Sequence, residues 1–304
     1  MDIQKKFEMG AQNHTYQRVE PEYTVNIFLG YNDDGCMSMV ITENGIEAHV
    51  KSSKFIDVKM KRREDKKIAL SFDLLDEAYK PLFLIFCNDM INICGKAGPE
   101  MAISTALIRW KYWKEMFGRR KNKLLDKLEI KGLIGELLVL ENYFLKKYDE
   151  TTAISCWMGP LLGHKDFEID DTWFEIKTIS ENATQVIISS LEQLESETDG
   201  HLIVVRLEDT SNVMEQGINI NTLVLNILST LQDPDNIDLF QTKLDNMGYA
   251  IDPDYENYNF LFKGEQRYFV NNEFPRLRRS KISENIANVK YSILLNGLTN
   301  FLEK

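Results

Sequence analysis

Residues 159–178 read GPLLGHKDFEIDDTWFEIKT, and this stretch predicts two short strands joined by a turn at Asp170-Asp171. Glu175 and Lys177 stand two positions apart in the second strand. Because alternate residues of a strand project to the same face, these two side chains share one side of the sheet while their apolar neighbours pack on the other. The stretch therefore predicts a hairpin with one polar and one apolar face.

Asp166 stands at the head of the first predicted strand, nine residues before Glu175. The hairpin returns Asp166 toward the side that carries Glu175 and Lys177. Two carboxylates beside one amine are suited to hold a divalent cation and a water, as metal-dependent phosphodiester hydrolysis requires. A surface hairpin with a Glu-Lys pair has the same spacing, and the bare D-x8-E-x-K pattern often occurs by chance.

Further motifs surround these residues in a defined order: Gly132-x-x-Gly135-Glu136-Leu137-Leu138, Trp157-x-Gly159-Pro160, Asp166-Phe167, Glu175-Ile176-Lys177-Thr178 and Ile188-Ser189-Ser190-x-x-Gln193-Leu194. Together they resemble the PD-(D/E)XK nuclease superfamily, and within it a bacterial group that is often associated with restriction-type defence operons. The likeness covers about residues 100 to 304. One departure is Lys165, which stands where the superfamily name has a proline, a position that is commonly replaced.

The resemblance implies an α/β (α+β) fold, with a restriction-endonuclease-like mixed β-sheet core flanked by helices. It implies Mg²⁺ as the cofactor, with Mn²⁺ as the alternative. The metal ligands would be the side chains of Asp166, Glu175 and Glu136 and the backbone carbonyl of Ile176. Lys177 would position the attacking water, help to deprotonate it, or offset charge on the phosphate. Gln193 would help to orient the site.

Two of these residues have ordinary alternatives. Glu136 lies in the longest helical stretch, 124–147, whose apolar residues recur at helical spacing: Leu125, Leu128, Leu133, Leu137, Leu140 and Phe144. Glu136 either faces the metal or is an exposed helix residue, and Gln193 is either a site residue or a surface amide on a helix that Ser189 and Ser190 would cap. Gly132 and Gly135 each cost roughly 1 kcal/mol of helix stability relative to Ala, which suggests close packing of another segment.

The composition is that of an ordinary globular protein, with 304 residues, 43% hydrophobic and 27% charged. No apolar run approaches the ~20 residues that cross a bilayer, and the N-terminus lacks the apolar core of a signal peptide. The four cysteines are scattered without a CxxC motif, which fits free thiols in a reducing cytoplasm. We therefore expect a cytoplasmic protein without membrane contact.

The formal net charge of −11 argues against nucleic-acid binding by the chain as a whole, since phosphate contacts dominate such affinity. Local basic clusters offset this average. The first is Lys111, Lys114, Arg119, Arg120, Lys121 and Lys123; the second is Lys59, Lys61, Arg62, Arg63, Lys66 and Lys67; the third is Arg276, Arg278, Arg279 and Lys281. Each could be solvated surface, but we expect DNA contacts from Arg119, Arg120, Lys121, Arg276, Arg278 and Arg279.

Gly and Pro at 95–99 predict a domain boundary, because both residues interrupt regular structure. Residues 1–97 alternate in the manner of strands, with turns at Asp34-Gly35 and Asn44-Gly45, and predict a small, mainly β module. This module could bind DNA, contact a partner subunit or only brace the core. Residues 98–304 would form the nuclease-like domain with C-terminal helical and strand additions.

These observations favour a Mg²⁺-dependent DNA endonuclease that acts as a subunit of a bacterial restriction or anti-phage defence system. A partner ATPase, helicase or methyltransferase and an oligomeric state are compatible with that prediction. The first alternative is a non-catalytic DNA-binding or assembly subunit, and the second is an RNA or repair nuclease. The sequence has no GxxxxGK[ST] or G-x-S-x-G motif, so ATP hydrolysis or serine-hydrolase chemistry by this chain is not expected.

Overall fold

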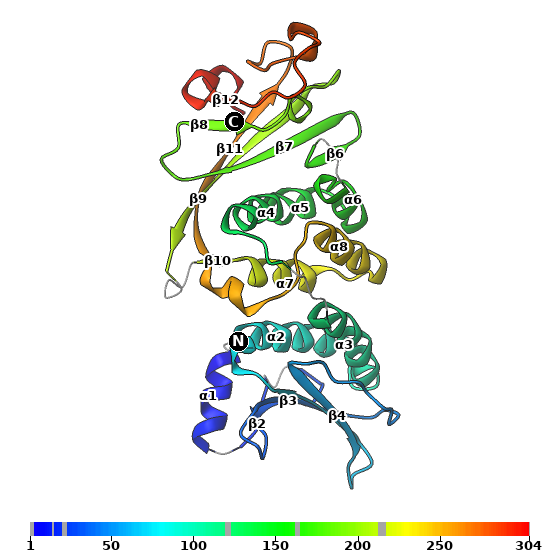
Figure 1. Ribbon diagram of the computed structural model, residues 1–304. Coiled ribbons are helices and arrows are strands. Elements are labelled where there is room, and N and C mark those ends of the chain that lie inside the picture. Colours follow the sequence, from blue (N-terminus) through cyan, green and yellow to red (C-terminus); the bar gives the residue numbers. More distant parts are fainter. Residues whose placement is uncertain are drawn as a thin grey trace. The chain divides into compact units, whose positions relative to one another are not determined.

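The computed structural model divides the chain into two compact units, Met1–Arg120 and Lys121–Lys304. It describes residues 3–13, 15–19, 23–118, 123–161, 165–211 and 217–303. Each unit contains its own β-sheet (Figure 1). Across the described residues, no helix has both the length and the apolar character that crossing a membrane requires.

The first unit consists of an antiparallel sheet and α-helices. The sheet has the order β1-β2-β3-β5-β4, with β1 Gln17–Arg18, β2 Ile27–Tyr31, β3 Met37–Glu43, β4 Ile56–Arg62 and β5 Ile68–Leu74. The helices are α1 Ile3–Asn13, α2 Lys80–Ala97 and α3 Ala102–Gly118. The turn between β2 and β3 places Gly35 at φ 79°, a conformation that glycine adopts without a Cβ clash. The predicted hairpin at Asp34-Gly35 is confirmed, since β2 pairs with β3. The turn at Asn44-Gly45 makes no hairpin, because β3 pairs with β5 and not with the following strand β4.

Helices α2 and α3 pack against each other inside the first unit. The Arg109 guanidinium of α3 donates to both carboxylate oxygens of Asp89 of α2, at 2.7 and 3.0 Å, and the Trp113 indole donates to the same carboxylate at 2.6 Å. The boundary expected after residue 97 falls between these helices, whereas the compact unit extends to Arg120. Gly98, at φ 76°, ends α2 and allows the turn into α3, so the Gly-Pro signal marks a helix-helix connection.

The second unit contains a five-stranded mixed sheet, in which β7 and β9 are parallel and the other pairs are antiparallel. Its order is β10-β11-β9-β7-β6, with β6 Phe167–Ile169, β7 Thr172–Ile179, β9 Gly200–Thr210, β10 Ile218–Asn219 and β11 Asn259–Val270. The helices are α4 Lys127–Val139, a π-helical turn Leu140–Phe144, α5 Leu145–Lys147, α6 Glu150–Ser155, α7 Ile220–Thr230 and α8 Pro234–Asn246. The predicted α+β class with a mixed sheet is confirmed.

Helix α4 packs on β7, α7 packs on α4, and α6 packs on α8, so helical layers cover one face of this sheet (Figure 1). Gly135 permits the close approach of α4 to β7, because a Cβ there would overlap the side chain of Thr178. The expectation of close packing is confirmed for Gly135 and wrong for Gly132, which faces open space. Leu128 is also not part of the apolar stripe, since it lies in the exposed first turn of α4.

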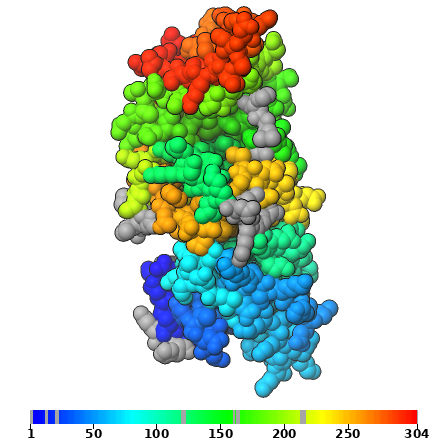
Figure 2. Space-filling model, in the orientation of Figure 1, coloured from blue at the N-terminus to red at the C-terminus, as the bar shows by residue number. Residues whose placement is uncertain are grey.

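The opposite face of the sheet carries a separate apolar core. A second, two-stranded sheet packs there, formed by β8 Gln185–Ile188 and β12 Tyr291–Leu294. Buried residues of this core include Trp173, Leu202, Val204, Val186 and Ile293. The end of the chain, red in the space-filling view, lies together in one region of the surface of this unit (Figure 2).

Candidate active site

Asp166 is fixed by the unpaired edge of β7. Strand β6 pairs with β7 only as far as Phe167 opposite Phe174, so the next part of β7 lacks a strand partner on that side. The Asp166 carboxylate takes this place, because its Oδ2 accepts from the Ile176 backbone N–H at 2.7 Å. The predicted hairpin turn is confirmed, with Asp170 at φ 52°.

Glu175 and Lys177 share one face of β7, as the strand alternation predicted. The Lys177 Nζ lies 2.5 Å from Glu175 Oε1. Glu175 is 1% exposed, and its second oxygen, Oε2, is buried without a hydrogen-bond partner. A buried carboxylate oxygen with no partner loses its hydration without replacement, so this position favours a bound cation or proton.

Glu136 reaches the same region from α4. Its Oε2 accepts from the Trp157 indole at 2.7 Å. Both Glu136 Oε2 and Asp166 Oδ1 lie within 4 Å of the point that a Cβ on Gly159 would occupy, at 2.8 and 3.5 Å respectively. The carboxylates of Glu136 and Asp166 therefore converge beside Gly159, where any larger residue would intrude.

The segment from Trp157 to Gly159 joins these acids and is held from two sides. The backbone N–H groups of Met158 and Gly159 donate to the Asp166 carbonyl at 2.7 and 3.1 Å. The buried Lys243 of α8 donates to the Trp157 carbonyl and to the last carbonyls of α6, Ile154 and Ser155. A cation at a helix C-terminus is favoured by the helix dipole.

Burial raises the pKa of all three acids, and neighbouring acids raise it further for Glu175 and Glu136. Burial and the neighbouring Asp166 raise the pKa of Glu175 to about 8. Burial, and then the charges of Asp166 and Glu175, raise the pKa of Glu136 well above its usual value. Burial also raises the pKa of Asp166, an effect that Lys177 and the Ile176 N–H partly offset. Carboxylates in this state gain most from a divalent cation placed among them.

The donor set fits Mg²⁺ or Mn²⁺ with retained waters. Among the described residues, no three His, Cys, Asp or Glu side chains are placed to hold one metal ion together. Mg²⁺ commonly binds to one or two carboxylates and completes its shell with water and substrate phosphate. The unpartnered Glu175 Oε2 and the neighbouring Asp166 carboxylate meet that smaller requirement.

Gln193 lies in a short 3₁₀ turn, Leu191–Gln193, and the expected helix after Ser190 is not formed. Its Oε1 accepts from the Ser189 backbone N–H at 2.7 Å, so the amide closes its own loop. The expectation that Ser190 caps a helix through its side chain is wrong, since Ser190 makes no such bond.

Two buried cations hold this turn, and the sequence reasoning missed both roles. Lys165, 5% exposed, donates to the carbonyls of Glu192 and Glu195 at 2.6 and 3.0 Å, and its Nζ lies 4.0 Å from the centre of the Trp173 ring. Arg276 is also buried and donates to the Leu194 carbonyl. The sequence contains one indication, and only for Lys165, which stands in place of the superfamily proline.

The structure describes three of the six residues that were predicted to contact nucleic acid. Arg119, Arg120 and Lys121 lie outside the described residues. Arg276 lies in the interior, so its cation is not presented to a ligand at the surface. Arg278 donates to Asn272 at 2.6 Å, and the exposed Arg279 donates to the Ile286 carbonyl at 2.7 Å. These arginines therefore organise the loop in which they lie.

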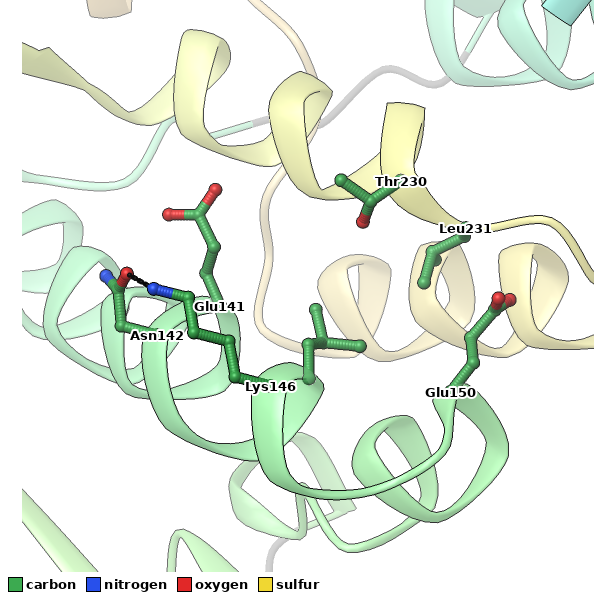
Figure 3. A pocket seen from close by; sticks show the side chains of 7 residues that line it. Glu141, Asn142, Lys146, Glu150, Thr230 and Leu231 are labelled. Atoms are coloured by element: carbon green, nitrogen blue, oxygen red, sulfur yellow. Dashed lines mark hydrogen bonds between the residues drawn. The ribbon is translucent and has the colours of Figure 1, made fainter.

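The second unit also has a hollow of about 520 Å³ that Asp166, Glu175 and Glu136 do not line (Figure 3). It is lined by Glu141, Asn142, Leu145, Lys146, Glu150, Thr230 and Leu231. Lys146 is engaged with Asn142 at 2.9 Å, and Glu150 accepts from the backbone N–H groups of Gln232 and Asp233. Asp166, Glu175 and Lys177 are not among its lining residues, so this hollow is separate from the acid cluster.

A comparison with protein families places this chain in a known group. Residues 5–296 match the family described as "Putative PD-(D/E)XK family member, (DUF4420)". Searches of the curated proteins and of the solved structures found no match. Nucleases of the PD-(D/E)XK superfamily typically use divalent metals, which agrees with the acids beside Lys177. Because the match spans nearly the whole chain, the protein belongs to the DUF4420 family and, through it, to the PD-(D/E)XK group.

Proposed function

We propose that this protein is a Mg²⁺-dependent endonuclease that hydrolyses phosphodiester bonds in DNA, and that it is a subunit of a bacterial restriction or anti-phage defence system. The observation that carries the proposal is the buried, unpartnered Glu175 Oε2 beside Asp166, with the Lys177 amine on the other oxygen of the Glu175 carboxylate. Membership of the PD-(D/E)XK group supports a nuclease activity. The assignment to a defence system rests on the resemblance of the sequence motifs.

In this proposal Asp166, Glu175 and the Ile176 carbonyl would hold the metal, and Glu136 would act directly or through a water. A divalent ion supplies two effects, a lower pKa of its bound water and stabilisation of charge on the phosphate. The chain supplies orientation: the Ile176 N–H fixes Asp166, and the Trp157 indole fixes Glu136.

Lys177 has one role in the free protein and another with substrate. In the free protein its amine lies on Glu175 Oε1, where its positive charge lowers the pKa of this buried carboxyl and so favours the ionised form. With a cation held by Glu175, the amine would no longer be needed there and could position the attacking water, help to deprotonate it, or contact the phosphate. A residue in such a proton-transfer role contributes typically 10²- to 10⁴-fold to the rate. Gln193 supports the loop beyond β8 rather than the metal itself.

Cleavage of supercoiled plasmid DNA in Mg²⁺ tests the proposal. Asp166→Asn is expected to abolish cleavage, and Lys177→Met to lower the rate roughly 10²- to 10⁴-fold. The matched control is Asp171→Asn, which makes the same change at an exposed turn residue of the same hairpin and should leave the rate unchanged. Circular dichroism of each variant separates loss of chemistry from loss of folding.

The rival functions are outcomes of the same assay. The wild-type protein would be a non-catalytic binding or assembly subunit if it bound DNA without cleaving any substrate in Mg²⁺ or Mn²⁺. The substrates are duplex, single-stranded, branched and modified DNA, and RNA. Cleavage confined to RNA or to branched DNA would identify an RNA or repair nuclease. Equal plasmid cleavage by wild type and Asp166→Asn would overturn the assignment of the site.

A further inference from the structure

The net negative charge of this protein lies in its second unit. Residues 1–120 contain 18 Lys and Arg against 17 Asp and Glu, whereas residues 121–304 contain 18 against 30. A polyanion such as DNA is repelled by net negative charge at long range. A substrate surface on the second unit would therefore oppose the field of that unit, while the first unit carries no such penalty.

The first unit has a basic groove between α3 and the segment that precedes β4. It has a volume of about 330 Å³ and is lined by Ala48, His49, Val50, Lys51, Leu107, Trp110, Lys111 and Lys114. The buried Trp110 fixes its shape, because the indole donates to the Lys51 carbonyl at 3.0 Å and ties that segment to the helix. Lys111 and Lys114, three residues apart on α3, lie on one side of the helix.

The cations of this groove are not neutralised. Within the described chain, the amines of Lys51, Lys111 and Lys114 form no ion pair, whereas Lys59 and Lys67 of the same unit pair with acids. Two acids lie nearby in sequence. Glu47 is within 4.0 Å of Arg62, and Glu115 is exposed beside Lys114. Three lysines and a histidine therefore face the same groove with free donors.

We propose that this groove, Ala48–Lys51 with Lys111 and Lys114, is a contact site for the phosphate backbone of a nucleic acid. The inference deepens the proposed function, since it assigns a surface that holds the substrate, but its binding test requires no cleavage. Lysine amines bind phosphate as point charges without reading the sequence of bases. The groove is therefore expected to supply affinity and position, not base specificity.

The test is binding of a fluorescein-labelled 30-base-pair DNA duplex by the full-length protein, followed by fluorescence anisotropy in EDTA so that no cleavage occurs. Lys111→Gln/Lys114→Gln is compared with Lys61→Gln/Lys96→Gln, which removes two exposed cations of the same unit outside the groove. Loss of two phosphate contacts should make the negative slope of log K against log salt less steep by about 1.8. At 0.1 M salt the same loss weakens binding at least about tenfold.

The control pair is expected to bind within about twofold of wild type. Equal affinity and equal salt slope for both double variants would overturn the proposal. Binding of an acidic protein partner, lost in the groove variant while DNA binding is retained, would also overturn it and would assign the groove to protein contact. Neither result depends on whether Asp166→Asn abolishes cleavage, so this site and the proposed active site fail independently.

Discussion

Replacing Glu175 by Gln is expected to stabilise the metal-free protein while removing its response to divalent metal. Gln has the same shape and can still accept from Lys177, but it carries no charge. Glu175 is 1% exposed, and burial together with Asp166 raises its pKa to about 8. The change therefore removes the cost of ionising a buried carboxyl that Asp166 repels, and it removes one proposed ligand oxygen from the metal site.

The sign of the pH dependence follows from the raised pKa. An unfolded Glu ionises near pH 4.3, so between that pH and about 8 the unfolded chain has lost a proton that the folded chain retains. The free energy of unfolding of the wild type in EDTA thus falls across this window, by up to roughly 5 kcal/mol at about 1.4 kcal/mol per pKa unit. Glu175→Gln lacks this loss, so its gain in free energy of unfolding over wild type is near zero at pH 4.5 and largest above pH 8.

The assay is urea unfolding at pH 4.5, 6.5 and 8.5 in EDTA, with hydrogen exchange of β7 and β9 peptides as the readout for the second unit. A second series adds Mn²⁺. At a metal concentration of 100 times Kd, wild type should gain about 2.7 kcal/mol and the variant much less. Glu168→Gln, an exposed position on β6, is the control and should follow wild type in both series.

A Glu175→Gln variant that is no more stable than wild type at pH 8.5 in EDTA would refute the buried-charge argument. An equal gain from Mn²⁺ in wild type and variant would refute the assignment of Glu175 as a ligand. Either result stands by itself, since the first concerns the free protein and the second the metal complex.

Three further predictions concern the surroundings of the site. Gly159→Ala places a Cβ 2.8 Å from Glu136 Oε2 and should weaken Mn²⁺ binding about 10- to 100-fold in titration calorimetry; unchanged affinity would mean that Glu136 takes no part. Lys243→Met leaves buried carbonyls unsatisfied and should lower the free energy of unfolding in urea by about 3 to 5 kcal/mol. The control Lys263→Met, at an exposed ion-paired lysine, should lower it by less than about 1 kcal/mol, and equal losses would contradict the prediction. At pH 8 Ellman's reagent should label Cys36 alone in the native protein. Burial raises the pKa of Cys94 and Cys156 to about 12 and that of Cys87 well above its usual value. Rapid labelling of all four thiols without urea would show that these three are accessible.

The hairpin and its polar face were predictable because they depend on local rules. The Asp170-Asp171 turn and the alternation around Glu175 fix which side chains share a face, and the structure agrees. Glu136 was ambiguous, since periodicity alone does not separate an inward from an outward position when the apolar stripe is imperfect. Its bond to the Trp157 indole depends on a contact 21 residues away in sequence.

The remaining differences come from long-range contacts. The buried Lys165 and Arg276 look like surface residues in the sequence, and only the turn that both of them hold explains their burial. The pairing of β8 with β12 joins segments about 100 residues apart, which no local pattern specifies. Leu128 fits a helical apolar period but lies in the first turn of α4, before the helix reaches the core.

The most direct measurement is anomalous diffraction from crystals of the full-length protein soaked in Mn²⁺. We expect a single strong peak within about 2.0 to 2.3 Å of oxygens from both Asp166 and Glu175, with the Lys177 amine displaced from Glu175. No peak between these carboxylates at a Mn²⁺ concentration that supports cleavage, or a peak bound elsewhere in the second unit, would contradict the convergence of these acids on one cation.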